Sequence, residues 1–161
     1  MAKLVKPKES DRSPVIMTEI VLPSHTNALG TIFGGVVMGW IDIAAAIAAT
    51  RYARSPAVTV SIDYLHFIVP IKLGYTVQIK AEVTYAGKTS MEIEVNVDAE
   101  NSITGESHPA TKAFLTFVAV DKNGKPTQVP AYNPKSAFEK KRFKQAEDRK
   151  RERLRLFSGQ S

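Results

Sequence analysis

Asp42 is the most unusual residue of this chain, because it lies in the middle of a long apolar segment. No Lys, Arg or His lies within one helical turn of it on either side. A carboxylate without a partner in apolar surroundings costs several kcal/mol, so another group must offset that cost. A structural interpretation is that Asp42 caps a neighbouring backbone or pairs with a distant arginine, Arg51 or Arg54. The functional interpretation is a carboxylate held in low dielectric, suited to act as a general base or nucleophile.

A second group of residues lies just before this segment and has the types needed to stabilise negative charge. Asn27, Gly30, Gly34 and Gly35 fall where the chain turns into the apolar segment. If a helix starts there, its first backbone amides have no acceptor of their own and can face an oxyanion. Eight helical residues separate Gly34 from Asp42, or about 12 Å along the axis. We therefore expect amides and carboxylate to meet across a dimer interface.

The elements that position these residues follow from the spacing of apolar side chains. Residues 35–52 are apolar on nearly all sides and rich in alanine, which predicts one long enclosed helix. Strict alternation predicts strands at 75–83 and 91–97, each with one face toward solvent and joined by a tight hairpin. Further strand-like runs cover 15–22, 57–68 and 111–120. The sequence thus predicts an α+β domain in which a curled antiparallel sheet wraps around one central helix and self-associates.

Composition and charge divide the chain into three parts. With 161 residues and 43% hydrophobic residues, it is long enough for one core. Residues 135–157 hold ten Lys/Arg and four Asp/Glu, which is the whole net charge of +6. We predict a flexible segment at 1–14, a domain at 15–134 and a basic, helical tail at 135–161. The tail pattern is typical of a solvated helix; an oligomer-docking helix, a basic rim for phosphorylated ligands and an RNA-binding arm are the alternatives.

Several other classes of function do not fit the sequence. It has no cysteine, so disulfide scaffolds, thiol catalysis and cysteine metal sites are excluded. The three histidines are far apart. No signal peptide is expected, because residues 1–14 are rich in charge and contain no apolar block, and no membrane span is expected, because Asp42 and glycines interrupt the one apolar run. Gly87-Lys88-Thr89 suggests a phosphate loop, but Glu82 stands where that motif needs glycine. No Gly-x-Ser-x-Gly elbow occurs.

The residues around Asp42 resemble a known family. Residues 26–35, Thr-Asn-Ala-Leu-Gly-Thr-Ile-Phe-Gly-Gly, followed by Met-Gly-Trp-Ile-Asp at 38–42, are similar to the signature of hotdog-fold acyl-CoA thioesterases, in particular the cytosolic acyl-CoA hydrolase subgroup. Residues 59–63, 87–95, 114–120 and 139–143 also match, so the resemblance covers about residues 15–150. It implies a hotdog fold, a cytoplasmic enzyme that hydrolyses acyl-CoA without a metal or other cofactor, and dimers assembled into hexamers.

The resemblance also implies roles for individual residues. Asp42 would activate water or attack the thioester, Asn27 would orient water or thioester, and the backbone amides of Gly34 and Gly35 would bind the oxyanion. Phe33 departs from members that carry histidine there. Six residues are candidates for contacts to the coenzyme A phosphates: Arg51, Arg54, Gly87, Lys88, Thr89 and Ser90.

An alternative of another class remains open at this point. The chain can also be interpreted as a non-catalytic module that binds acyl-CoA or acyl carrier protein. A nucleic-acid partner is not expected, because the domain itself carries no net charge.

Overall fold

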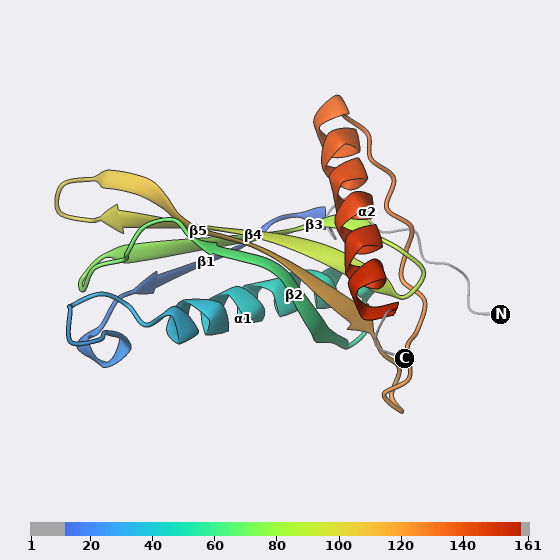
Figure 1. Cartoon of the computed structure of the whole chain (residues 1–161), viewed down its shortest axis with the longest axis horizontal. Coiled ribbons are helices and arrows are strands. Elements are labelled where there is room, and N and C mark those ends of the chain that lie inside the picture. Colours follow the sequence, from blue (N-terminus) through green and yellow to red (C-terminus); the bar gives the residue numbers. More distant parts are fainter. Residues whose placement is uncertain (1–11, 159–161) are drawn as a thin grey trace.

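The computed structural model describes residues 12–158, whose five strands form one antiparallel sheet in the order β1-β3-β4-β5-β2. Helix α1 lies against one face of the sheet, and helix α2 crosses the opposite face near one end (Figure 1). Most of the predicted segment at 1–14 lies outside the described residues. In chain order the elements are β1 (Val15–Ile20), the short 3-10 helix η2 (Pro23–His25), α1 (Gly34–Ala53), β2 (Ala57–Phe67), β3 (Thr76–Ala86), β4 (Ser90–Asn101), β5 (Glu106–Ala119) and α2 (Ala137–Ser158).

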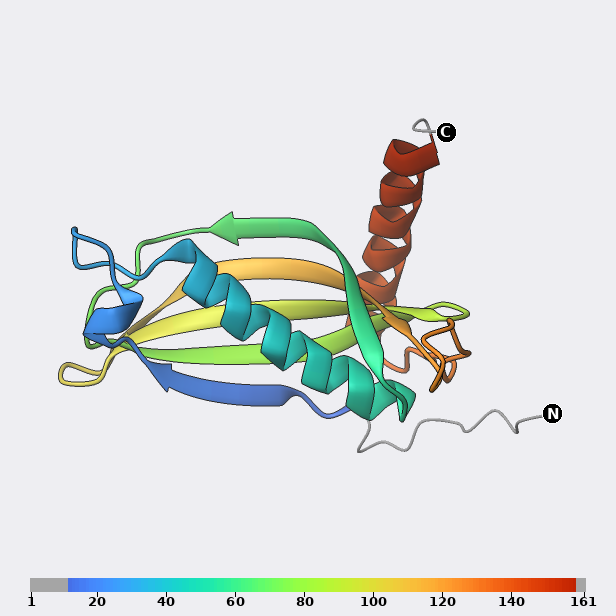
Figure 2. The ribbon, with the colours of Figure 1, turned by 90° about the horizontal axis from the view of Figure 1, so that it is seen from below.

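Helix α1 packs at the centre of the core, as the apolar segment predicted, but it is not enclosed on nearly all sides, because Met38 and Ile43 on its outer face are 37% and 51% exposed. It runs diagonally across the sheet (Figure 2), and its alanines allow its backbone to approach the strands closely. By length and composition alone α1 is also apolar enough to cross a membrane. Here it packs on the sheet through seven buried residues: Val37, Ile41, Ala44, Ala45, Ala48, Ala49 and Tyr52.

The core face of the sheet confirms the alternation predicted for the two central strands. Val77, Ile79, Ala81 and Val83 of β3 are buried beside the apolar residues of β4. The two strands form the expected hairpin, in which the Gly87 amide donates to the Ser90 carbonyl at 2.8 Å. The α+β prediction of a sheet around one helix is therefore confirmed.

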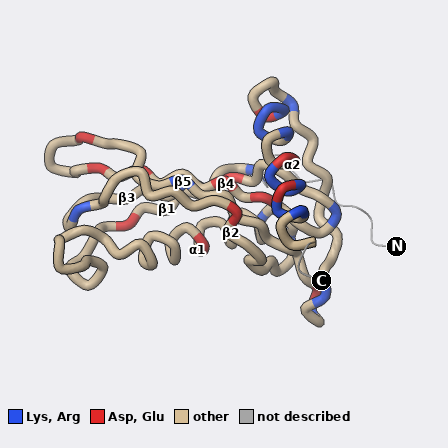
Figure 3. The backbone as a smooth tube through the Cα atoms, viewed as in Figure 1, with Lys and Arg blue, Asp and Glu red and all other residues tan. Residues whose placement is uncertain are grey.

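The outer face of the sheet differs from the prediction, because α2 covers part of it. Lys and Arg residues are concentrated along α2 where it crosses the strands (Figure 3). Glu92 and Glu94 of β4, which were expected to face solvent, are only 3% and 9% exposed. The expectation of a wet outer face on β4 is therefore wrong at these two residues.

One stripe of α2 makes this contact and explains it physically. Arg142, Ala146, Arg149 and Arg153 recur at helical spacing and share a face, and Ala146 is buried against the sheet. The expectation of a solvated helix is wrong for this face of α2 and correct for the opposite face, where Lys140, Lys144 and Arg151 are exposed.

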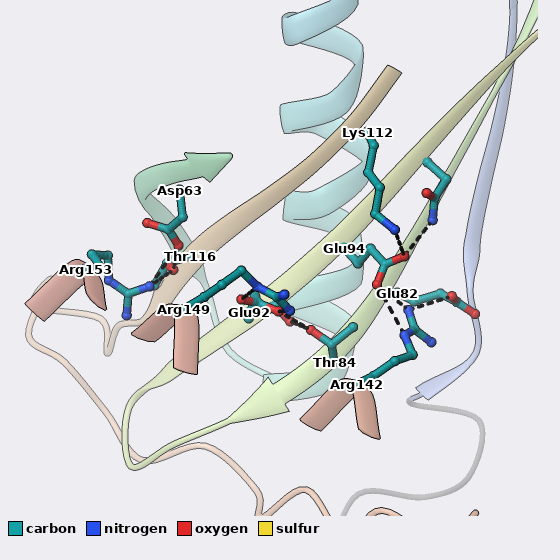
Figure 4. Close-up of polar contacts among 11 residues, drawn as sticks. Asp63, Glu82, Thr84, Glu92, Glu94, Lys112, Thr116, Arg142, Arg149 and Arg153 are labelled. Atoms are coloured by element: carbon teal, nitrogen blue, oxygen red, sulfur yellow. Dashed lines mark hydrogen bonds and ion pairs between the residues drawn. The ribbon is translucent and has the colours of Figure 1, made fainter. Parts of the chain in front are cut away.

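The arginines of this stripe pair with carboxylates of the strands (Figure 4). Arg142 contacts Glu82 and Glu94, both at 3.1 Å, Arg149 contacts Glu92 at 2.8 Å and Arg153 contacts Asp63 at 2.8 Å.

Candidate active site

Asp42 lies in the third turn of α1, half-buried, and faces β2. Its observed partner is a neutral hydroxyl: Thr59 Oγ1 donates to Asp42 Oδ1 at 2.6 Å. Arg51 and Arg54 lie at the far end of α1, at least about 13 Å further along the axis, which is beyond the reach of an arginine side chain. A carboxylate that accepts one hydrogen bond from a hydroxyl keeps further lone pairs with which to take a proton from water.

Thr59 reaches Asp42 because of the way β2 pairs with β5. The register places Thr59 opposite Phe117, whose side chain is buried in the core, so Thr59 points toward α1. The ladder is irregular between Thr59 and Ser61 and again between Ile62 and Tyr64, as in β-bulges. Such bulges re-aim side chains next to functional sites. Sequence reasoning did not assign a role to Thr59, because the period of the strand does not reveal a bulge.

Asn27 organises the loop that leads into α1. Its side-chain oxygen accepts from the Leu29 amide at 2.9 Å, and its amide nitrogen donates to Thr31 Oγ1 at 3.0 Å. Gly30 completes the turn with φ of +74°, a conformation that favours glycine. Within one protomer Asn27 therefore shapes the loop beside the first turn of α1.

Gly34 and Gly35 are the first two residues of α1. Phe33 precedes them as N-cap and provides no side-chain hydrogen bond to the helix. The first amides of a helix lack intrahelical acceptors and carry partial positive charge, so they are suited to an oxyanion. A Cβ on Gly34 would lie 3.1 Å from Phe67 Cζ, whereas a Cβ on Gly35 would meet nothing within 4 Å.

An apolar cavity opens beside this first turn. It has a volume of about 260 Å³, and Gly34, Val37, Phe67 and Ile71 form part of its wall. It lies at the end of α1 that Asn27 approaches, and Asp42 lies two turns away. The structure thus brings Asp42 to Thr59 and Asn27 to the start of α1, but it does not bring Asp42 to Asn27 within one protomer.

The candidates for phosphate contacts lie at the other end of the molecule. Arg51 and Arg54 are in the last turn and at the C-cap of α1, and the 87–90 hairpin is near the same end, which α2 crosses (Figures 1 and 2). Lys150 of α2 adds a cation that the sequence did not assign. Its Nζ donates to Tyr85 Oη at 3.2 Å and would lie 2.8 Å from a Cβ on Gly87. In the described part of the chain, no three His, Asp or Glu side chains converge as metal ligands.

Comparison with known proteins agrees with this geometry. The profile of the thioesterase superfamily matches residues 29–106. An uncharacterized acyl-CoA thioester hydrolase of Bacillus subtilis, YkhA, is 43% identical over 127 residues, which is 79% of this chain and 74% of that protein. The rat cytosolic acyl coenzyme A thioester hydrolase is 34% identical over 89% of this chain, which spans 38% of its length.

Solved structures agree over most of the chain. An apo-hexameric acyl-CoA thioesterase superposes with a TM-score of 0.88 at 42% identity, over 94% of this chain and 97% of that one. The acyl-CoA hydrolase of Staphylococcus aureus, solved with butyryl coenzyme A and coenzyme A, has a TM-score of 0.83 at 38% identity over 92% of each chain. Variants of the Staphylococcus aureus enzyme that replace one aspartate, one threonine or one asparagine by alanine have similar structures. The hotdog fold expected from the sequence is confirmed, and the chain belongs to the thioesterase superfamily, among its acyl-CoA thioester hydrolases.

Proposed function

We propose that this protein hydrolyses acyl-CoA thioesters to a free acid and coenzyme A. The observation that carries the proposal is the Asp42 carboxylate, which lies on the apolar core helix with the Thr59 hydroxyl 2.6 Å away. A structural role alone would not need an acid at that position. Two named relatives are acyl-CoA thioester hydrolases, which favours the same chemistry.

The reaction can be written with the groups that the chain supplies. Water attacks the thioester carbonyl carbon while Asp42 takes one of its protons, and the carbonyl oxygen becomes an oxyanion. The amides of Gly34 and Gly35 stabilise that oxyanion. When it collapses, the carbon–sulfur bond breaks, and the proton held by Asp42 passes to the departing sulfur. The products are a carboxylic acid and the coenzyme A thiol.

Each site draws on two subunits in this proposal. Within one protomer, Asp42 is about 12 Å along α1 from Gly34, which is too far for both to act on one carbonyl. We assign Asn27, Gly34 and Gly35 of one subunit and Asp42 with Thr59 of another to the same site. The exposed apolar side chains of the edge strand β2, among them Val60 and Ile62, favour such a dimer. A similar structure is named hexameric, so we extend the proposal to three dimers in a hexamer.

The nucleotide end of coenzyme A binds, in this proposal, at the basic end of the molecule. Arg51 and Arg54 lie near that end, as do the hairpin residues Gly87, Lys88, Thr89 and Ser90. Lys150 of α2 extends the group of cations. Within one protomer this end is far from the first turn of α1. In a two-subunit site the partner can present its hairpin, so both groups can bind one coenzyme A thioester.

Asp42→Asn tests the proposed chemistry directly. The amide keeps the shape of the carboxylate and cannot take a proton, so kcat/KM for butyryl-CoA should fall by about 10²- to 10⁴-fold. Coenzyme A release is measured with a thiol reagent, and the melting temperature shows whether the fold is intact.

Asp148→Asn is the matched control, since Asp148 lies on the exposed face of α2 and should leave turnover unchanged. Undiminished hydrolysis by Asp42→Asn would remove Asp42 from the reaction. Tight binding of acyl-CoA by the wild type with no thiol release would instead identify a binding module.

A further inference from the structure

The last turns of α2 extend beyond the edge of the sheet. Arg142 contacts the central strands β3 and β4, and Arg153, further along the helix, contacts Asp63 of the edge strand β2. Five residues follow Arg153 before the helix ends at Ser158, or about 7 Å of helix axis. Figure 2 shows this red end of α2 projecting past β2, away from the other strands. Because the sheet of residues 12–158 ends at β2, it has no further strand for the end of α2 to cover.

Two apolar side chains at this end of α2 continue the face that packs on the sheet. Leu156 and Phe157 follow Arg153 by three and four residues, so they lie on the same side of the helix as Arg153 and the buried Ala146. Leu156 is 61% exposed and Phe157 is 59% exposed. The face that is covered by strands along most of α2 therefore presents an aliphatic and an aromatic side chain to solvent where the sheet ends.

The same two side chains border a groove that α2 shares with β2. The groove has a volume of about 240 Å³, and Ile62 of β2 forms part of its wall together with Leu156 and Phe157. Ile62 is 39% exposed, and Val60 of the same strand is 54% exposed. The exposed apolar surface of the edge strand thus continues onto the end of α2. An exposed edge strand with apolar side chains is a surface on which another chain can pair.

We infer that the end of α2 docks on a second copy of this chain, across the β2 edge, through Leu156 and Phe157. The inference rests on the proposed function, in which two subunits meet at β2 and share each site. Both side chains lie on the sheet-facing side of α2, so the surface that fits them is a continuation of the sheet, and a second copy joined at β2 provides it. Two-fold symmetry makes the contact reciprocal, since the end of each α2 lies on the other subunit.

Single cysteines can show which end of α2 is covered, because the chain has no cysteine of its own. Phe157→Cys and Phe138→Cys place a thiol at the two ends of α2, where the phenylalanines are 59% and 67% exposed in one chain. In the assembled protein a maleimide should react at least about tenfold more slowly at position 157, because the interface limits access to the thiol. In urea, where the chain is unfolded, the two rates should be equal. Equal rates in the folded dimer would overturn the inference.

The double variant Leu156→Ala with Phe157→Ala tests how much the contact stabilises the dimer. Alanine preserves the helix, and by symmetry four side chains are removed from one interface. The dissociation constant of the dimer should therefore rise by about a hundredfold or more. Phe138→Ala is the matched control, since Phe138 is equally exposed on the same helix but lies outside the groove. Sedimentation velocity over a dilution series measures the assembly, and circular dichroism measures the helix content.

The other outcomes of sedimentation are equally decisive. An unchanged dissociation constant in the double variant would overturn the inference, and so would the release of intact dimers from a hexamer, because Leu156 and Phe157 would then lie between dimers. An unchanged dimer that no longer binds phosphatidylserine vesicles would assign the end of α2 to a lipid surface instead. If the wild type releases no thiol from acyl-CoA, the proposed function fails, and labelling and sedimentation still decide the role of the end of α2.

Discussion

At the scale of single residues, the contact between Thr59 and Asp42 has a consequence for turnover. The hydroxyl donates to the carboxylate at 2.6 Å and fixes its orientation. Thr59→Val keeps the side-chain volume and removes the donor, so kcat should fall by about ten- to a hundredfold, the effect of a hydrogen bond to a charged group. Thr59→Ser retains the donor and should recover most of the rate. Steady-state thiol release and melting temperatures measure both, and equal rates for the two variants would mean that the hydroxyl does not act on Asp42.

At the scale of elements, α2 supports the strand that carries Thr59. Arg153 donates to Asp63 Oδ2 at 2.8 Å, and Thr116 donates to the same oxygen at 2.6 Å (Figure 4). Asp63 also accepts from Ser61 at 2.7 Å. These contacts fall at the irregular part of β2, so they stabilise the backbone that directs Thr59 toward Asp42.

Arg153→Gln therefore has two expected effects. It should lower the free energy of unfolding by about 1–3 kcal/mol, because the Asp63 carboxylate loses a charged partner. It should also lower kcat by about tenfold through a small misplacement of Thr59, with KM less affected. Denaturant unfolding and steady-state kinetics measure the two effects.

Arg142→Gln provides the comparison for Arg153→Gln. The Arg142 side chain is 16% exposed and that of Arg153 14%, but Arg142 binds Glu82 and Glu94 of the central strands. It should cost similar stability and leave kcat near the wild-type value. Equal losses of kcat in both variants would indicate a general effect of α2 rather than a role of Arg153 in positioning.

The packing of α2 also predicts a dependence of stability on pH. Burial raises the pKa of Glu94, but the hydrogen bond from Asn96 and the charges of Arg142 and Lys112 lower it by more, so the pKa lies below its ordinary value of 4.5. The unfolded chain then binds a proton more readily than the folded one. The stabilisation by ionised Glu94 is present above about pH 4.5 and is lost as the pH falls through the lower pKa of the folded state.

Glu94→Gln should therefore flatten the curve of unfolding free energy against pH below pH 4.5. Urea unfolding at a series of pH values measures this curve. Glu152→Gln, at an exposed pair with Arg155 on α2, should leave the slope almost unchanged. A slope unaltered by Glu94→Gln would assign the acid sensitivity to other carboxylates.

At the scale of the whole molecule, a two-subunit site can be tested by mixing two inactive chains. Asn27→Ala and Asp42→Asn should each abolish turnover. In a mixed dimer both changes fall in one site, and the other site is intact. Equal co-expression of the two chains, assayed without selecting the mixed dimers, should therefore restore about a quarter of the wild-type rate, because half of the dimers are mixed and each has one intact site. The intact site uses Asn27 of the other chain, so the recovery of activity does not depend on how Asn27→Ala alters the loop around residue 27. If the mixture is no more active than either variant alone, both residues of a site belong to one chain.

The main elements of this protein and its most informative residue can be predicted from the order of its residues. The alternation in β3 and β4 and the apolar run of α1 depend on side chains close in the chain, so their periods predict the sheet, the helix and its burial. Asp42 can be identified in the same way, because it is a charged residue within an otherwise apolar helical segment and this needs no knowledge of tertiary contacts. The residues at 26–35 and 38–42 gave the resemblance to the thioesterases, which the comparisons confirmed.

Tertiary structure alone decided which distant groups meet. Thr59 contacts Asp42 because β2 is irregular, and a bulge depends on pairing with β5 rather than on the period of β2. The arginines of α2 share a face in the sequence, but their partners on β2, β3 and β4 become defined only when the sheet places those carboxylates side by side. Contacts of this kind join residues far apart in the chain, so they are set by packing and not by local propensity, whereas the separation of Asp42 from Gly34 already follows from the rise of the helix.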